Sequence, residues 1–317
     1  MVVIQFWNSS IAPMIFINPK IDFAFKKIFG SEENKDILIS FLNAIIYQEQ
    51  PVIQDLEILN PYVAPKIRGI KDSYLDIKAK IIDDDHKIRS VIIEMQVLNV
   101  EGFEKRILYN AAKSYSTQLT TGQSYSELTP VIALTITDFI MFPDIDKVLS
   151  RFVLKEKDYL IDYPIYDIEL IFVELPKFKK QLSELKFLID KWLFFMTEAR
   201  SLELVPEEMT QVPEIKKAFY IANQVNLTPD ELEDQEKSEI FIHDQRGAIV
   251  KGFQQGLQQG LQQGIEQGLQ QGIEQGIEQN TMEIAKKMLN LVDDQVICQI
   301  TGLSLTEISA LKIKSLG

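Results

Sequence analysis

The chain has 317 residues, 46% of them hydrophobic, which is enough to bury a substantial core and to carry further segments beside it. A net charge of −13 argues against a protein that coats nucleic acid through a broad positive field, so any DNA contact has to be local. The single cysteine, Cys298, excludes an internal disulfide, and no apolar run reaches the roughly 18 residues of a membrane span, which together favour a cytoplasmic protein.

The N-terminal part of the chain predicts a tail and two helices. Residues 1–14 lack a positive stretch before an apolar run, so we expect a disordered tail and no signal peptide. A short amphipathic helix follows, with Asn18 as its cap, Pro19 at its first position and Gly30 at its end. Its apolar stripe consists of Ile21, Ala24, Phe25, Ile28 and Phe29. The stripe of a second helix consists of Ile37, Leu38, Phe41, Leu42 and Ile45.

The next two apolar runs, 74–82 and 91–97, flank a polar segment without a helical pattern and therefore predict an antiparallel hairpin. Asp76 and Glu94 are equidistant from Asp85, so a symmetric hairpin places them opposite each other with Cα atoms roughly 5 Å apart. The two-residue period puts Gln96 on the face of Glu94.

A carboxylate inside such an apolar run is costly to desolvate unless a cation or hydrogen-bond donors compensate it. The pair Asp76 and Glu94 therefore indicates a divalent cation site. The competing interpretation is an ordinary salt-bridged sheet, in which Lys78 and Lys80 are the partners on the face of Asp76.

The hairpin and its surroundings resemble the Rpn family of recombination-promoting nucleases, also labelled transposases, in the PD-(D/E)XK superfamily. The resemblance rests on residues 18–30, 75–79 and 94–96, and on 106–125 followed by 130–136. It implies an α/β fold with a restriction-endonuclease-like core, a mixed sheet flanked by helices. It also implies an endonuclease that cleaves DNA with Mg²⁺, for which Mn²⁺ is a possible substitute.

For the site, the resemblance implies a metal held by Asp76 and Glu94, which a backbone carbonyl at Met95 would join. Gln96 would then be a third catalytic residue, hydrogen-bonded to the attacking water or to a phosphate oxygen. The superfamily usually has Lys there, and a neutral amide supplies no positive charge. The alternative function is therefore a catalytically inert nuclease fold that acts as an oligomeric DNA-binding or regulatory module.

Asp22, in the first turn of the first helix, has two interpretations. It stabilises the helix through the macrodipole, or it is an accessory acid of the metal site, as in some PD-(D/E)XK enzymes.

After the hairpin, an apolar stripe at helical spacing predicts a helix from about 103 to 119, and its other face presents Arg106, Asn110 and Lys113. Such a row is either solvated surface or a DNA phosphate contact. The stripe consists of Phe103, Ile107, Leu108, Ala111, Ala112, Tyr115 and Leu119. The continuously apolar run 131–136 then predicts a central strand, 165–173 another strand, and 182–222 helices packed on the core.

A capping box from Thr228 to Glu231 predicts the start of a helix that leads into a repeat over 252–279. The repeat consists of seven four-residue units, each with glycine first, an apolar residue second, Gln or Glu third and Gln fourth. Each helical glycine costs roughly 1 kcal/mol relative to alanine, so an isolated helix is disfavoured. The repeat is either a Gln-rich flexible tether or a self-associating helix in which glycines let two backbones approach, and we expect a homodimer or higher oligomer. The apolar residues are Phe253, Leu257, Leu261, Ile265, Leu269, Ile273 and Ile277.

The chain is thus expected to divide into five segments. They are the tail 1–14, a nuclease-like domain 15–200, a helical extension 201–251, the repeat helix 252–279 and a small helix-turn-helix-like unit 280–317. In the last segment a second capping box joins Ser304 and Glu307, and only Lys312 and Lys314 are basic in its final helix, so sequence-specific reading of DNA is poorly supported there.

Overall fold

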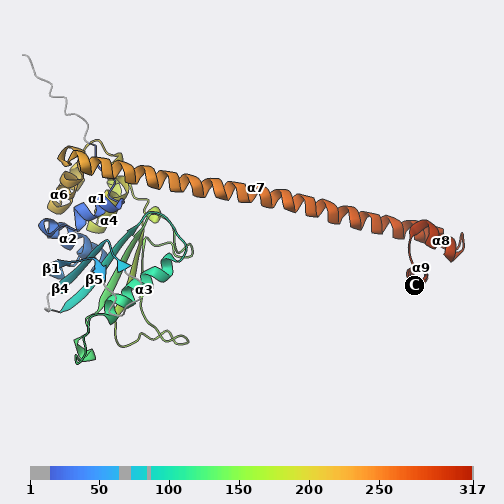
Figure 1. Ribbon diagram of the computed structural model, residues 1–317, viewed down its shortest axis with the longest axis horizontal. Coiled ribbons are helices and arrows are strands. Elements are labelled where there is room, and N and C mark those ends of the chain that lie inside the picture. Colours follow the sequence, from blue (N-terminus) through green and yellow to red (C-terminus); the bar gives the residue numbers. More distant parts are fainter. Residues whose placement is uncertain (1–14, 64–72, 84–86, 316–317) are drawn as a thin grey trace, which may run out of the picture. The chain divides into compact units, whose positions relative to one another are not determined.

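The computed structural model describes residues 15–63, 73–83 and 87–315 (Figure 1). The predicted tail and the centre of the predicted hairpin turn, with Asp85, lie outside the described residues. The chain divides into two compact units, Met1–Asp244 and Gln245–Gly317, and each is described by itself.

A six-stranded mixed sheet forms the centre of the first unit, with the strand order β1-β4-β5-β6-β8-β7. β5, β6 and β8 are parallel, whereas β1, β4 and β7 pair antiparallel with their neighbours. The strands are β1 (Ile53–Leu59), β4 (Ile77–Asp83), β5 (Ile88–Gln96), β6 (Val131–Thr137), β7 (Leu149–Phe152) and β8 (Ile168–Glu174), with a separate pair β2 (Tyr62–Val63) and β3 (Ser73–Tyr74). The expected mixed sheet is therefore confirmed.

Helices cover both faces of this sheet (Figure 1). One face carries α3 (Phe103–Ser116), which connects the parallel strands β5 and β6. The opposite face carries α1 (Asp22–Phe29), α2 (Lys35–Ile46), α4 (Leu188–Glu198), α5 (Glu207–Thr210) and α6 (Pro213–Ala222). Short 3₁₀ turns are η1 (Glu32–Asn34), η2 (Tyr125–Glu127), η3 (Leu175–Lys177), η4 (Leu182–Glu184), η5 (Ala199–Ser201) and η6 (Gln224–Asn226).

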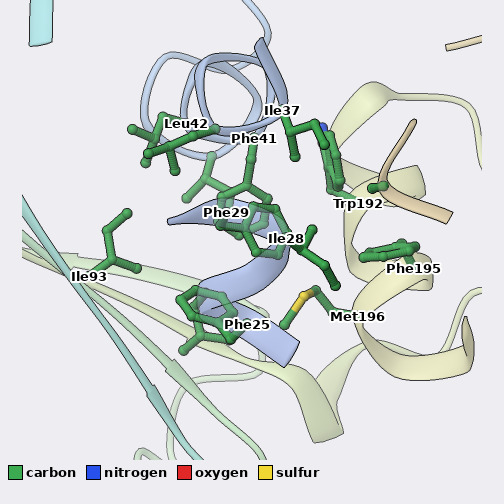
Figure 2. Close-up of a cluster of buried hydrophobic side chains, with 14 of the residues drawn as sticks. Phe25, Ile28, Phe29, Ile37, Phe41, Leu42, Ile93, Trp192, Phe195 and Met196 are labelled. Atoms are coloured by element: carbon green, nitrogen blue, oxygen red, sulfur yellow. The ribbon is translucent and has the colours of Figure 1, made fainter. Parts of the chain in front are cut away.

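The larger core lies between the sheet and the helices of the second face (Figure 2). Phe29 and Phe41 each lie 5.7 Å from Trp192, measured between ring centroids. The apolar stripes predicted for the first two helices are buried in this core, as expected, except Ile21, which is buried but lies just before α1 and outside this cluster. Met209 and Phe219, from the segment predicted as a helical extension, belong to the same core. This packing holds α1 against the sheet, with its polar face outward.

The start of α1 differs from the prediction. The helix begins at Asp22, and the Asn18 side chain accepts a hydrogen bond from the backbone N–H of Lys20 at 3.1 Å, in the preceding turn. Asn18 is therefore no helix cap, because its short amide competes for a backbone donor two residues on and stabilises a turn instead.

β4 and β5 form the predicted hairpin. Ile77 lies opposite Ile93 and Ile82 opposite Ile88, so the same register places Asp76 across from Glu94. The symmetric register expected from the sequence is confirmed for Ile77–Ile82 against Ile88–Ile93. Asp76 itself directly precedes β4, where the ladder between the two strands has ended.

A single long helix, α7 (Pro229–Met288), contains the complete repeat. The predicted capping box opens it: the N–H of Thr228 donates to Glu231 at 2.9 Å, and the N–H of Glu231 donates to the Thr228 hydroxyl at 3.3 Å. The apolar repeat residues are exposed, from 53% at Ile273 to 71% at Phe253. An added Cβ at any repeat glycine would meet nothing within 4 Å among the described residues.

In the second unit, α8 (Asp294–Thr301) and α9 (Leu305–Ser315) pack with the end of α7 around Ala285, Ile297 and Ile308. The Lys312 ammonium pairs with Asp294 at 2.6 Å, which ties α9 to α8. In the part of the chain that the structure describes, no single helix has the length and apolarity to cross a membrane, although α8 together with Leu305–Ile313 meets that test as a pair bent by 113°.

Candidate active site

The two carboxylates predicted from the hairpin are each held by one donor. Asp76 Oδ2 accepts a hydrogen bond of 2.6 Å from the backbone N–H of Met95. Glu94 Oε1 accepts one of 2.5 Å from the side-chain amide of Asn110 on α3. The other oxygens, Asp76 Oδ1 and Glu94 Oε2, make no hydrogen bond within the described residues; their nearest cations are Lys26 and Arg106, each at 3.8 Å.

Burial makes the charged form of both carboxyls costly. It raises the pKa of Asp76 to about 7, against the lowering effects of the Met95 N–H and Lys26, and the carboxylates of Asp22 and Glu94 add to the rise. Burial also raises the pKa of Glu94, against the lowering effects of Asn110 and Arg106. The surrounding protein therefore compensates these charges only in part, and an additional cation would stabilise both ionised forms.

The donor set fits Mg²⁺, a hard cation that prefers oxygen ligands and is commonly bound by only one or two carboxylates. In the described part of the chain, each of the two carboxylates keeps one oxygen that accepts no hydrogen bond. Among the described residues, no group of three or more His, Cys, Asp or Glu side chains is arranged to hold a metal. A further protein ligand would therefore come from the backbone or from a different side chain.

The Met95 carbonyl is the backbone group placed for this role. The Gln96 carbonyl accepts from the N–H of Asp138 beside β6, so Gln96 directs its backbone toward β6. Backbone groups alternate in direction along a strand, which turns the N–H and C=O of Met95 the other way, toward β4. The Met95 N–H indeed meets Asp76 on that side.

Asp22 is linked to this site by Lys26, which contacts both Asp22 and Asp76. The Lys26 ammonium lies 2.7 Å from Asp22 Oδ1, one helical turn away, and 3.8 Å from Asp76 Oδ1. Asp22 therefore both pairs along α1 and adds negative potential at Asp76, and Lys26 is a site residue that the sequence analysis did not select. The signal available in the sequence was the four-residue spacing from Asp22.

Gln96 lies beside the carboxylates with both ends of its amide engaged. Its Nε2 donates to the carbonyl of Leu98 at 2.7 Å, and its Oε1 accepts from Arg106 Nη2 at 2.7 Å. Arg106 comes from α3, and its guanidinium also lies over the ring of Phe103, 5.0 Å from the centroid. The amide expected to meet water or phosphate is thus hydrogen-bonded within the chain.

The predicted orientation of α3 is wrong in part. Asn110 and Lys113, expected on the outer face, are only 4% and 7% exposed, whereas Leu108 and Ala112 of the predicted stripe are exposed. The physical reason is the buried Glu94 carboxylate, whose need for a donor turns Asn110 inward. Arg106 alone of the predicted row keeps an accessible side chain, 45% exposed.

The alternative of a salt-bridged sheet placed Lys78 and Lys80 beside Asp76. In the described parts of the chain neither lysine is within ion-pair distance of Asp76, whose cationic neighbour is Lys26. Burial lowers the pKa of the Lys78 ammonium, and the neighbouring charge of Lys80 lowers it further. The two lysines therefore do not neutralise the carboxylate pair.

Comparison with models of known protein families gives a match over the part of the chain that contains the candidate site. A family model described as a PD-(D/E)XK nuclease family transposase matches residues 19–252, which include every candidate residue of the site. Comparisons with curated proteins and with solved structures give no match.

Proposed function

The chain belongs to the PD-(D/E)XK nuclease family of transposases, and from this premise we propose that it is a Mg²⁺-dependent DNA endonuclease. The observation that supports the proposal best is the pair of carboxylates at the hairpin, the half-buried Asp76 and the buried Glu94, each with one oxygen that makes no hydrogen bond to the described residues. The direct test is nicking of plasmid DNA with Mg²⁺, with Mn²⁺ and with a chelator. Cleavage that persists in chelator would contradict the proposal.

Asp76, Glu94 and the Met95 carbonyl would hold the cation. When bound, a divalent cation lowers the pKa of an attacking water and neutralises charge on the scissile phosphate. The chain's own residues orient the ligands: the Met95 N–H fixes the Asp76 carboxylate, and Asn110 fixes that of Glu94. Oriented ligands cost little reorganisation during reaction, which is the usual source of catalytic strength in such sites.

Metal binding is expected to strengthen as pH rises from 6 to 8. The cation needs ionised Asp76, whose pKa is about 7, so each pH unit below 7 should weaken affinity about tenfold. The measurement is the thermal stabilisation by Mg²⁺ or Mn²⁺, which shrinks by about 1.4 kcal/mol for each tenfold loss of affinity at saturating metal.

The folding stability of the metal-free protein should change in the opposite direction and decrease as pH rises. The raised pKa of Asp76 means that the folded chain favours the protonated acid, so this contribution to stability is present below pH 3.8, the ordinary value, and is lost as pH rises through about 7. Asp76→Asn should weaken both trends, and the remainder comes from Glu94, whose pKa burial also raises. An inert nuclease fold would show no metal-dependent stabilisation at either pH.

We further propose that a second copy of the chain covers the repeat in α7, so that the protein is a homodimer. Apolar residues recur every four positions while the helix turns every 3.6, so the exposed stripe drifts by about 40° per repeat around the axis. A second copy of α7 has a stripe of the same pitch and glycines at the same spacing. Two nuclease sites in one assembly would suit cleavage of both DNA strands.

A further inference from the structure

The nuclease site has a positive charge in a different place from the usual superfamily lysine. Arg106 Nη2 lies 2.7 Å from Gln96 Oε1 and 3.8 Å from Glu94 Oε2. Its side chain remains 45% exposed, and the aromatic ring of Phe103 supports the guanidinium at 5.0 Å from the centroid. Arginine carries five N–H donors in a planar fork that matches phosphate oxygens, so the contact with Gln96 leaves donors for a ligand.

The partners of Gln96 determine how its amide is oriented. The carbonyl of Leu98 only accepts hydrogen bonds, and a guanidinium only donates them. Nε2 must therefore point to Leu98, and Oε1 must point to Arg106, in agreement with the two distances of 2.7 Å. A lysine at position 96 could not do this, since its ammonium would repel Arg106.

Lys26 is a less suitable phosphate cation. Its ammonium lies 2.7 Å from Asp22 and 3.8 Å from Asp76, between two carboxylates that neutralise it. Arg106, by contrast, has one carboxylate neighbour among the residues that the structure describes, Glu94 at 3.8 Å.

We propose that Arg106 is the residue that contacts the scissile phosphate and that Gln96 is a positioning residue that holds it beside Glu94. The inference rests on the proposed endonuclease function and assigns a phosphodiester ligand to one cation of that site. It also explains why a neutral amide follows Glu94: the charge comes from α3, ten residues further along the chain.

The first test compares Arg106→Gln with Lys105→Gln, which removes an exposed charge from the neighbouring position of α3. DNA affinity is measured by fluorescence anisotropy in chelator over a series of salt concentrations. Arg106→Gln should reduce the slope of log affinity against log salt by about 1, and with Mg²⁺ it should lower kcat by roughly 10²- to 10³-fold. Lys105→Gln should change kcat less than twofold. Equal slopes for the two variants would overturn the proposal.

The second test separates positioning from structure. Gln96→Leu should lower kcat more than it changes KM, with the metal-dependent thermal shift retained, because only the hold on Arg106 is lost. Gln96→Lys alone should also lower kcat. In contrast, the double variant with Gln96→Lys and Arg106→Gln should have a kcat at least tenfold higher than Arg106→Gln alone, because the lysine returns a positive charge to the site. If the double variant is no better than Arg106→Gln, the proposal fails. A wild-type protein without metal-dependent cleavage would refute the endonuclease function, and the salt slopes in chelator would still decide the role of Arg106.

Discussion

Replacing Glu94 or Asp76 by alanine is expected to abolish metal-dependent DNA cleavage while leaving the fold intact. Each change removes one of the two side-chain carboxylates available to the cation. Metal stabilisation of transition-state charge amounts to several kcal/mol, and each 1.36 kcal/mol is tenfold in rate, so a loss of about 10³-fold or more is expected. Rates of plasmid nicking with Mg²⁺ and Mn²⁺ measure the effect.

The isosteric changes Asp76→Asn and Glu94→Gln provide the sharper comparison, because they keep the shape of the side chain and remove its charge. Both metal-free variants should be at least as stable as the wild type at pH 8, since burial raises the pKa of both carboxyls. Glu104→Gln, at an exposed position of α3, is the matched control and should retain full activity. Full activity in Asp76→Asn and Glu94→Gln would refute the site.

Replacing five apolar residues of the repeat by serine is expected to convert the oligomer into monomers. These residues are 61–64% exposed in the single chain at Leu257, Leu261, Ile265 and Leu269, and 53% exposed at Ile273, so water contacts most of their apolar surface unless a partner covers it. Burial of that surface is the main driving force for association, and serine removes it. Sedimentation at micromolar concentration distinguishes dimer from monomer.

The matched control for this variant places the same five serines on a different face of α7. Gln255, Gln259, Gln263, Gln267 and Gln271 recur with the same period and are exposed, and changing them should leave the oligomer assembled. Deleting one whole four-residue unit should also be tolerated, because the stripe continues with its direction changed by about 40°. A monomeric wild type, or a fully assembled apolar-to-serine variant, would make the repeat a tether.

The helices and strands whose positions depend on residues close in sequence could be predicted from the sequence. The register of the β4–β5 hairpin follows from the position of the polar segment and the two-residue period of the strands, and it brings Asp76 to the end of β5 that carries Glu94, where Asp76 meets the Met95 N–H. The stripes of α1 and α2 follow in the same way from the helical period. Local exceptions arose where a side chain competed for backbone donors, as Asn18 does before α1.

The sequence by itself therefore determined the carboxylate pair and, through the family resemblance, the mixed sheet, whereas it left the repeat open between a flexible tether and a helix, which the structure shows as a helix. Only the tertiary structure decided how α3 is rotated, because two faces of that helix compete for burial and the choice depends on Glu94, a residue on another element. Asn110 turns inward to donate to this carboxylate, Arg106 meets Gln96, and Lys26 reaches Asp76 from α1. A local periodicity contains no information about which buried charge a neighbouring element presents, so these contacts follow only once the elements are packed together.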